Sequence, residues 1–142
     1  MKITVEKLKG LSACNSGIEY FGSKHSDGVE LTDLIREDIE TRDWRILEYA
    51  NWLIVHCMTY KQLTDYALCM AELILPECEK EYPYDCRLRI YTQMIRDFKD
   101  EKFTREQLLV AAHVVLYYSD FFKAIMIKIL QYGVTLLEVK NE

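Results

Sequence analysis

The sequence predicts an all-α protein, a single compact helical bundle of about six to eight helices that occupies residues 1–142. Three observations predict this fold. Apolar residues recur at intervals of three and four along most of the chain, as the buried face of an α-helix requires. Five glycines and two prolines are few interruptions for 142 residues. No stretch of strand length shows the alternating β-branched pattern of a half-buried strand.

Length, composition and charge fit one folded domain and argue against several other classes. Half of the residues are hydrophobic and 12% are aromatic, which is too apolar for a disordered tail. The net charge of −5 argues against a dedicated binder of the nucleic-acid backbone, which would carry a basic stripe. The longest apolar run contains Lys123 and Lys128 at helical spacing. That run therefore predicts a packed helix and no membrane span.

The first expected helices are short. Thr4 is a suitable cap for a helix over residues 5–9, which a glycine follows. A second short helix is expected over residues 13–21. Gly22 should end it, and the polar segment 23–28 should form a loop.

Two amphipathic helices are expected next. Leucine and isoleucine at helical intervals predict a helix over residues 31–40, for which Thr32 is a candidate cap. The segment that follows is richer in apolar residues. It predicts a well-buried helix from about Asp43 to Met58.

The fifth expected helix contains a proline. Thr59 is its candidate cap, and its apolar positions step by four, three and four residues: Leu63, Ala67, Met70 and Ile74. Pro76 lies inside this pattern and is expected to kink the helix or to end it. The residues after it could continue as helix until Pro83.

Capping signals also mark the next two helices. Asp85 is a candidate cap for a helix that runs to Phe98, and a charged loop over residues 99–102 follows. Thr104 and Gln107 have the spacing of a capping box, which predicts the start of the next helix.

The last helix is expected to begin near Ser119 or Asp120 and to run through Leu136. Gly133 lies inside its apolar stripe. A glycine at such a position costs about 1 kcal/mol relative to alanine. We expect that cost unless a neighbouring side chain packs against the glycine.

The five cysteines are irregularly spaced and do not form a metal-binding pattern. The chain has no CxxC, HExxH or HxxxH motif, and the adjacent His56 and Cys57 would diverge by about 100° on a helix. The start of the chain has no apolar export segment. We therefore predict no metal, no cofactor, a cytoplasmic location and reduced, mostly buried thiols that react slowly with iodoacetamide. These thiols belong to Cys14, Cys57, Cys69, Cys78 and Cys86.

Nucleophilic catalysis needs a thiol or hydroxyl held by a histidine. The sequence shows no arrangement of polar residues that this chemistry requires, so we predict no enzyme. His113 lies in the apolar run 108–118 and is expected to be a hydrogen-bonded core histidine. His25 lies in a polar segment and is expected to be solvated. The less favoured enzyme alternative would use Cys14, Cys57 or His56.

Two groups of side chains are candidates for binding a partner. The first is acidic and surrounds the expected kink and turn; it comprises Glu77, Glu79, Glu81 and Asp85. Lysines and arginines are interspersed with the acidic residues, which is typical of a solvated face, so mimicry of nucleic acid is a lesser alternative. The second group is the doublet Tyr117 and Tyr118. Adjacent helix positions cannot both point inward, so one tyrosine could anchor an interface, unless neighbouring helices cover both.

Three segments together resemble one known family: ACNSGIEYF, RDWRILEYANWLIVHCMT and DYALCMAELILPECEKEYPYDCRLRI. The C-terminal YGVTLLE is also similar to the ending of that family. Its members are small, all-helical proteins of phages, prophages and bacterial mobile elements, often labelled immunity proteins. The chain resembles a divergent member, because Leu88 and Tyr20 replace a proline and a tryptophan of the family pattern. The resemblance implies an α-bundle without known catalytic residues; Arg87 and Arg89 are expected to pair with nearby acidic side chains.

The phage or mobile-element origin that this resemblance implies favours a non-enzymatic protein. Such a protein would bind and block a bacterial defence or toxin protein, as an anti-CRISPR inhibitor or an immunity protein does. The partner would be a bacterial protein, such as a CRISPR effector or a toxin, with no direct contact to nucleic acid or membrane. The alternative is a self-associating accessory module, a homodimer without a tight host target.

Overall fold

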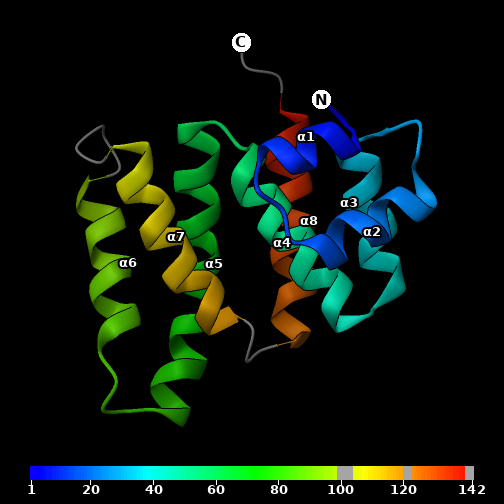
Figure 1. Ribbon diagram of the computed structural model, residues 1–142. Coiled ribbons are helices and arrows are strands. Elements are labelled where there is room, and N and C mark those ends of the chain that lie inside the picture. The colour runs from blue at the N-terminus through cyan, green and yellow to red at the C-terminus, as the bar shows by residue number, and fades with distance from the viewer. Residues whose placement is uncertain (99–103, 120–122, 140–142) are drawn as a thin grey trace.

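Helices make up most of the chain in the computed structural model, which describes residues 1–98, 104–119 and 123–139 (Figure 1). The helices of these ranges are α1 (Val5–Gly10), α2 (Asn15–Lys24), α3 (Leu31–Thr41), α4 (Trp44–Cys57), α5 (Tyr60–Glu81), α6 (Arg87–Phe98), α7 (Arg105–Ser119) and α8 (Lys123–Glu138). The predicted all-α class is confirmed.

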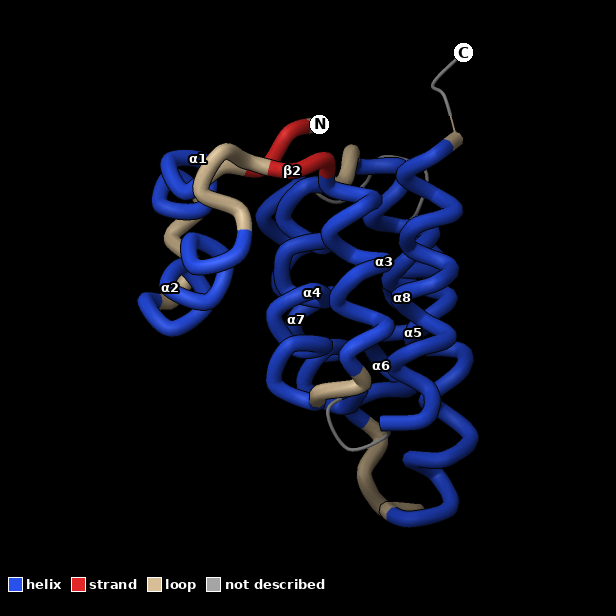
Figure 2. The backbone as a smooth tube through the Cα atoms, turned by 90° about the vertical axis from the view of Figure 1, so that its right-hand side faces the viewer, coloured by secondary structure: helices blue, strands red, loops and turns tan. Residues whose placement is uncertain are grey.

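The longest helix, α5, is the centre of the bundle. It packs against α6 and α7 on one side and against α8 on the other, and α3 and α4 pack against α8. Figure 2 shows these six helices running roughly side by side, with α1 and α2 forming a separate pair beside them. The N-terminus and the end of α8 lie at the same end of the bundle (Figures 1 and 2).

Local capping signals begin several helices as predicted. The Thr4 hydroxyl accepts a hydrogen bond from the Lys7 N–H, and Asp43 caps α4. Thr59 and Gln62 form a capping box at the start of α5. An equivalent pair opens α7: the Gln107 N–H donates to the Thr104 hydroxyl at 3.2 Å, and the Thr104 N–H donates to the Gln107 side chain at 2.9 Å. These bonds satisfy N–H groups that have no partner within the helix.

One predicted helix end and one predicted cap near the N-terminus are wrong. Helix α2 continues through Gly22 to Lys24, because one glycine inside a helix costs only about 1 kcal/mol and does not stop it. Helix α3 begins at Leu31 with Glu30 as its cap residue, so Thr32 lies inside the helix.

Helix α5 does not end at Pro76 but continues to Glu81. The proline has no N–H, so the carbonyl of Glu72 loses its partner four residues on. The proline ring is exposed, whereas Ile74 and Cys78 on either side of it are buried. Packing of the buried side chains therefore keeps this part of the chain helical.

A two-stranded antiparallel sheet, too short to be recognised from sequence patterns, ties the N-terminus to α3. Strand β1 (Lys2–Ile3) pairs with β2 (Val29–Glu30), with Ile3 opposite Val29. The N-terminal amine also lies 3.1 Å from the Glu30 carboxylate. These contacts hold the α1–α2 pair, which lies between the two strands in sequence, against the bundle.

A neighbouring side chain packs closely against Gly133, which is the condition under which a glycine is expected to be tolerated in this helix. A Cβ atom at this position would lie 2.7 Å from Cε1 of Tyr66 and 3.0 Å from Cδ1 of Ile54. The glycine therefore lets α8 approach α4 and α5 closely.

Some predicted features lie outside the described residues: the charged loop 99–102, the side chains of Phe98 and Ser119, and all of Asp120. Among the helices that are described, none combines the length and apolar content that a membrane crossing needs.

Candidate functional site

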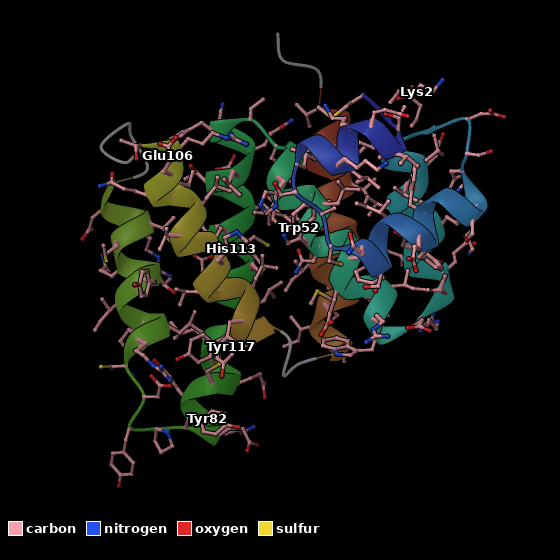
Figure 3. The ribbon with its side chains drawn as sticks, in the orientation of Figure 1. Lys2, Trp52, Tyr82, Glu106, His113 and Tyr117 are labelled. Atoms are coloured by element: carbon pink, nitrogen blue, oxygen red, sulfur yellow. The ribbon has the colours of Figure 1, made fainter. Side chains whose placement is uncertain are left out.

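A cavity of about 540 Å³ lies where the α1–α2 pair faces the bundle. Its lining comes from α1, α2 and the turn between them, and from α3, α4 and α7. Trp52 on α4 and His113 on α7 both contribute to it (Figure 3). Much of the lining is aliphatic, namely Leu8, Leu34, Leu53 and Leu116.

Polar and aromatic contacts hold α2 beside α4 and so shape the cavity. The Tyr49 hydroxyl donates to the Ser16 hydroxyl at 2.9 Å, and the rings of Tyr20 and Tyr49 lie 6.3 Å apart. Gly17 also lies beside this pair, since a Cβ there would be in ordinary contact with the Tyr49 ring at 3.7 Å. Tyr20, Tyr49 and Gly17 all line the cavity.

Asp38 is a buried acid in this lining. Asp38 is only 4% exposed, and its Oδ1 atom has no hydrogen-bond partner among the described residues. Burial raises its pKa to about 7; the neighbouring Glu37 adds to the rise and Lys24 opposes it. The Tyr20 hydroxyl, also buried, lies beside the Lys24 ammonium group and raises the pKa of that lysine. Asp38 Oδ1 is therefore a buried polar atom of the lining to which the described residues offer no hydrogen bond, which is rare in native proteins.

Asp38 is not among the functional residues predicted from the sequence, although the sequence contains a signal for it. The residue lies in the charged stretch REDIETRD, which reads as a solvated face. It is nevertheless four residues after Leu34 and three after Ile35, and both of these are buried. That spacing places the carboxyl group on the apolar face of α3.

His113 lines one side of the cavity, contrary to the core position predicted for it. His113 is exposed, and its ring centroid lies 5.3 Å from that of His56. His56 stacks on Trp52 at 4.1 Å and donates from Nδ1 to the Trp52 carbonyl. Partial burial, together with the proximity of His56, lowers the pKa of His113. The apolar neighbours of His113 in sequence belong to other faces of α7.

The solvated position predicted for His25 is also wrong. Its side chain is 18% exposed, and Nε2 lies 3.1 Å from the Glu37 carboxylate. The ring also lies 5.7 Å from that of Phe21.

The cysteines are in different environments. Cys57 and Cys69 are partly buried and Cys78 is buried, as predicted, and burial raises the pKa of all three thiols, that of Cys78 to about 11. Cys14 and Cys86 are exposed, so the prediction is wrong for these two. Cys14 lines the cavity, 3.5 Å from the Ser16 hydroxyl. Hydrogen bonds from Ser16 and from the Gly17 backbone lower the pKa of the Cys14 thiol.

Within the described residues, no group of three or more histidine, cysteine or acidic side chains is arranged to hold a metal ion.

Two members of the predicted acidic group pair with arginines, which confirms the predicted role of those arginines. A guanidinium nitrogen of Arg89 lies 2.7 Å from the Glu79 carboxylate, and one of Arg87 lies 2.8 Å from the Asp85 carboxylate. Asp85 also accepts hydrogen bonds from the Arg87 N–H at the start of α6 and from the Tyr118 hydroxyl. These donors hold the pKa of Asp85 well below its usual range. The group that also contains Glu77 and Glu81 is therefore partly neutralised.

The tyrosine doublet separates into one buried and one exposed residue, as its helical positions predict. Tyr118 is 5% exposed, and its pKa is raised to about 12 by burial and by its bond to Asp85. Tyr117 is 58% exposed and forms an edge-to-face pair with Tyr118. Tyr117, but not Tyr118, can therefore contact a partner over much of its ring.

Tyr117 belongs to a line of apolar residues on α7 that we name the outer stripe: Val110, Val114 and Tyr117. Val110 is 58% exposed and Val114 is partly buried. The stripe borders a groove of about 500 Å³, to which Arg87 and Tyr91 of α6 also contribute. Figure 3 shows Tyr117 and His113 along this helix.

Comparisons with protein-family models, with curated proteins and with solved structures give no match for this chain. The resemblance to the phage and mobile-element family stays a prediction.

Proposed function

We propose that this protein acts by contact: it binds another bacterial protein through the outer stripe of α7 and blocks it. The sequence resemblance suggests a component of a defence or toxin system as the target. In this proposal the helical bundle is a rigid support for the contact surface, and the chain catalyses no reaction.

The exposure of the outer stripe carries this proposal. Leu108, Ala112 and Val115 already supply α7 with a buried face. Val110 and Tyr117 add apolar area on the solvent side of the same helix. A helix that is apolar on opposite faces is normally covered on both. Exposed apolar residues that gather on one surface are typical of interaction sites.

The neighbours of the stripe also suit a protein interface. Arg87 extends over the Tyr118 ring, with its guanidinium carbon 5.7 Å from the ring centroid, and its side chain is 69% exposed. Tyrosine and arginine are enriched among the residues that dominate binding energy. The groove between α6 and α7 gives a partner side chain a place to insert.

Steric blocking fits the described charges better than acidic competition for a basic channel. Such competition needs carboxylates that have no positively charged partner. Arg89 and Arg87 already form ion pairs with Glu79 and Asp85. We therefore place the main contact on the outer stripe and not on the acidic group.

The proposal is tested by capture from bacterial lysates that contain defence and toxin systems. The tagged wild-type chain and the variant Val110→Ser/Tyr117→Ser would be compared by mass spectrometry of the retained proteins. We expect one enriched partner with the wild type, retained in moderate salt, and its loss with the variant.

A matched control carries Leu73→Ser and Ile90→Ser, two exposed apolar residues outside the groove. It should retain the partner. Enrichment of the chain alone would instead favour the self-associating module. Retention by the stripe variant would place the contact elsewhere.

A further inference from the structure

We propose that the cavity between the α1–α2 pair and the bundle binds a small organic cation, an aromatic molecule with a primary ammonium group that pairs with Asp38. This inference goes beyond the protein contact proposed for α7.

The state of Asp38 points to a ligand. Its residue is 4% exposed, it lines the cavity, and its Oδ1 atom has no partner among the described residues. Folding alone disfavours such a group, because it loses water and gains no hydrogen bond. A bound ammonium group would pair with the charge of the Asp38 carboxylate.

The charges of the lining favour a cation. Asp38 and Glu48 are its acidic residues, and neither lysine nor arginine is among the described residues that line it. The Lys24 ammonium group, whose charge acts on Asp38, lies 3.8 Å from the Glu37 carboxylate and 4.9 Å from the centre of the Tyr20 ring. Lys24 does not form a hydrogen bond with Asp38 Oδ1. An anionic ligand would meet two carboxylates.

The other residues that line the cavity favour a ligand with an aromatic ring. Leu34 and Leu53 supply aliphatic surface, and Tyr49 and Trp52 supply rings. A volume of about 540 Å³ is within the range of small-molecule sites. Aromatic side chains stack on flat ligands and attract cations to their faces.

Three probes of similar size separate the parts of this proposal: phenethylamine, 2-phenylethanol and 3-phenylpropionate. Isothermal titration calorimetry at pH 8, with the full chain, would give their affinities. We expect saturable binding of phenethylamine, at least tenfold weaker binding of the neutral alcohol, and weaker binding still of the carboxylate.

Asp38→Asn tests the anchoring residue, because it removes the charge and preserves the shape. It should weaken phenethylamine binding at least tenfold. The matched control Asp33→Asn changes an exposed acid of the same helix that does not line the cavity, and it should bind as the wild type does. Circular dichroism would establish that both variants are folded.

Alkylation of Cys14 offers a second readout at the cavity. Phenethylamine should slow the reaction of iodoacetamide with Cys14 and not with the exposed Cys86, which does not line the cavity. No saturable binding, equal binding of amine and alcohol, or full affinity in folded Asp38→Asn would each overturn the proposal.

Discussion

The Tyr66 hydroxyl donates a hydrogen bond of 2.7 Å to the side-chain oxygen of Asn51, and both residues are fully buried. The amide nitrogen of Asn51 donates to the sulfur atoms of Met126, at 3.1 Å, and Met70, at 3.8 Å. These contacts join α4, α5 and α8 through a small polar network inside an apolar core. Both polar atoms of the asparagine side chain are thereby satisfied.

Removing the Tyr66 hydroxyl should destabilise the fold. Tyr66→Phe leaves the Asn51 oxygen buried without its donor, which we expect to lower the free energy of unfolding by about 1–3 kcal/mol. Chemical denaturation measures this change. Tyr60→Phe is the matched control, because the Tyr60 hydroxyl is buried on the same helix and no described residue forms a hydrogen bond with it. Its removal should leave stability unchanged or raise it, and equal losses in the two variants would contradict the account.

Gly133→Ala should also destabilise the bundle. The added methyl group would lie 2.7 Å from the Tyr66 ring, so a packed aromatic side chain must shift. We expect a loss of about 1–3 kcal/mol from overpacking, reduced by up to about 1 kcal/mol of gained helix propensity. Gly10→Ala is the control, since a Cβ there meets no atom within 4 Å. Thermal unfolding should separate the two variants, and a Gly133→Ala protein as stable as the wild type would argue against the close approach of α8.

Asp38→Asn should stabilise the ligand-free protein in a pH-dependent way. The Asp38 pKa of about 7 lies above its ordinary value, because burial disfavours the charged form; Glu37 adds to this and Lys24 opposes it. The folded state therefore binds more protons than the unfolded state, and stability falls as the pH rises from about 4 to about 7. An asparagine at this position has no group to ionise, so its burial causes no such loss of stability as the pH rises.

Urea denaturation of both proteins from pH 4 to pH 8 would measure this difference. The advantage of the variant should grow to about 1–3 kcal/mol and become constant above about pH 7. Other titrating groups are common to both proteins and cancel. A gap that does not change with pH would show that Asp38 is ionised normally.

Cys14 should react with iodoacetamide faster than the other cysteines, in contrast to the uniformly slow reaction expected from sequence. It is exposed and its thiol pKa is lowered, whereas burial raises the pKa of Cys57, Cys69 and Cys78. The thiolate is the reactive form, so both effects act in the same direction. Mass spectrometry of timed digests would rank the five sites.

Ser16→Ala removes the hydroxyl beside Cys14 and should slow that reaction without changing the rate at exposed Cys86. Fastest labelling at a buried thiol such as Cys78 would contradict the described environments.

Sequence patterns predict the features of this protein that depend on neighbours along the chain. Thr59 and Thr104 begin helices because a capping box needs only residues three positions apart. The continuation of the helix through Pro76 is harder to predict, because burial of Ile74 and Cys78 in the assembled bundle offsets the missing hydrogen bond. The periodicity of α7 predicts one exposed tyrosine of the doublet, but not that Tyr118 would bond to Asp85.

The cavity depends on contacts between distant segments, so its lining could not be predicted. Cys14, Asp38 and His113 come from different helices or turns and line one cavity, beside which the sheet and the Tyr49–Ser16 bond hold α2 against the bundle. Asp38 alone had a local signal, its spacing from Leu34. The charged residues around it in sequence obscure that signal.

The affinity of the captured partner for purified variants tests the proposed function most directly. Surface plasmon resonance would compare the wild type, Val110→Ser/Tyr117→Ser and Leu73→Ser/Ile90→Ser. If the outer stripe of α7 is the contact surface, the first variant should bind at least about 30-fold more weakly, as the loss of a dominant contact residue implies, and the second within about twofold of the wild type. Equal affinities for all three proteins would contradict the account and exclude the stripe as the surface through which this protein blocks its target.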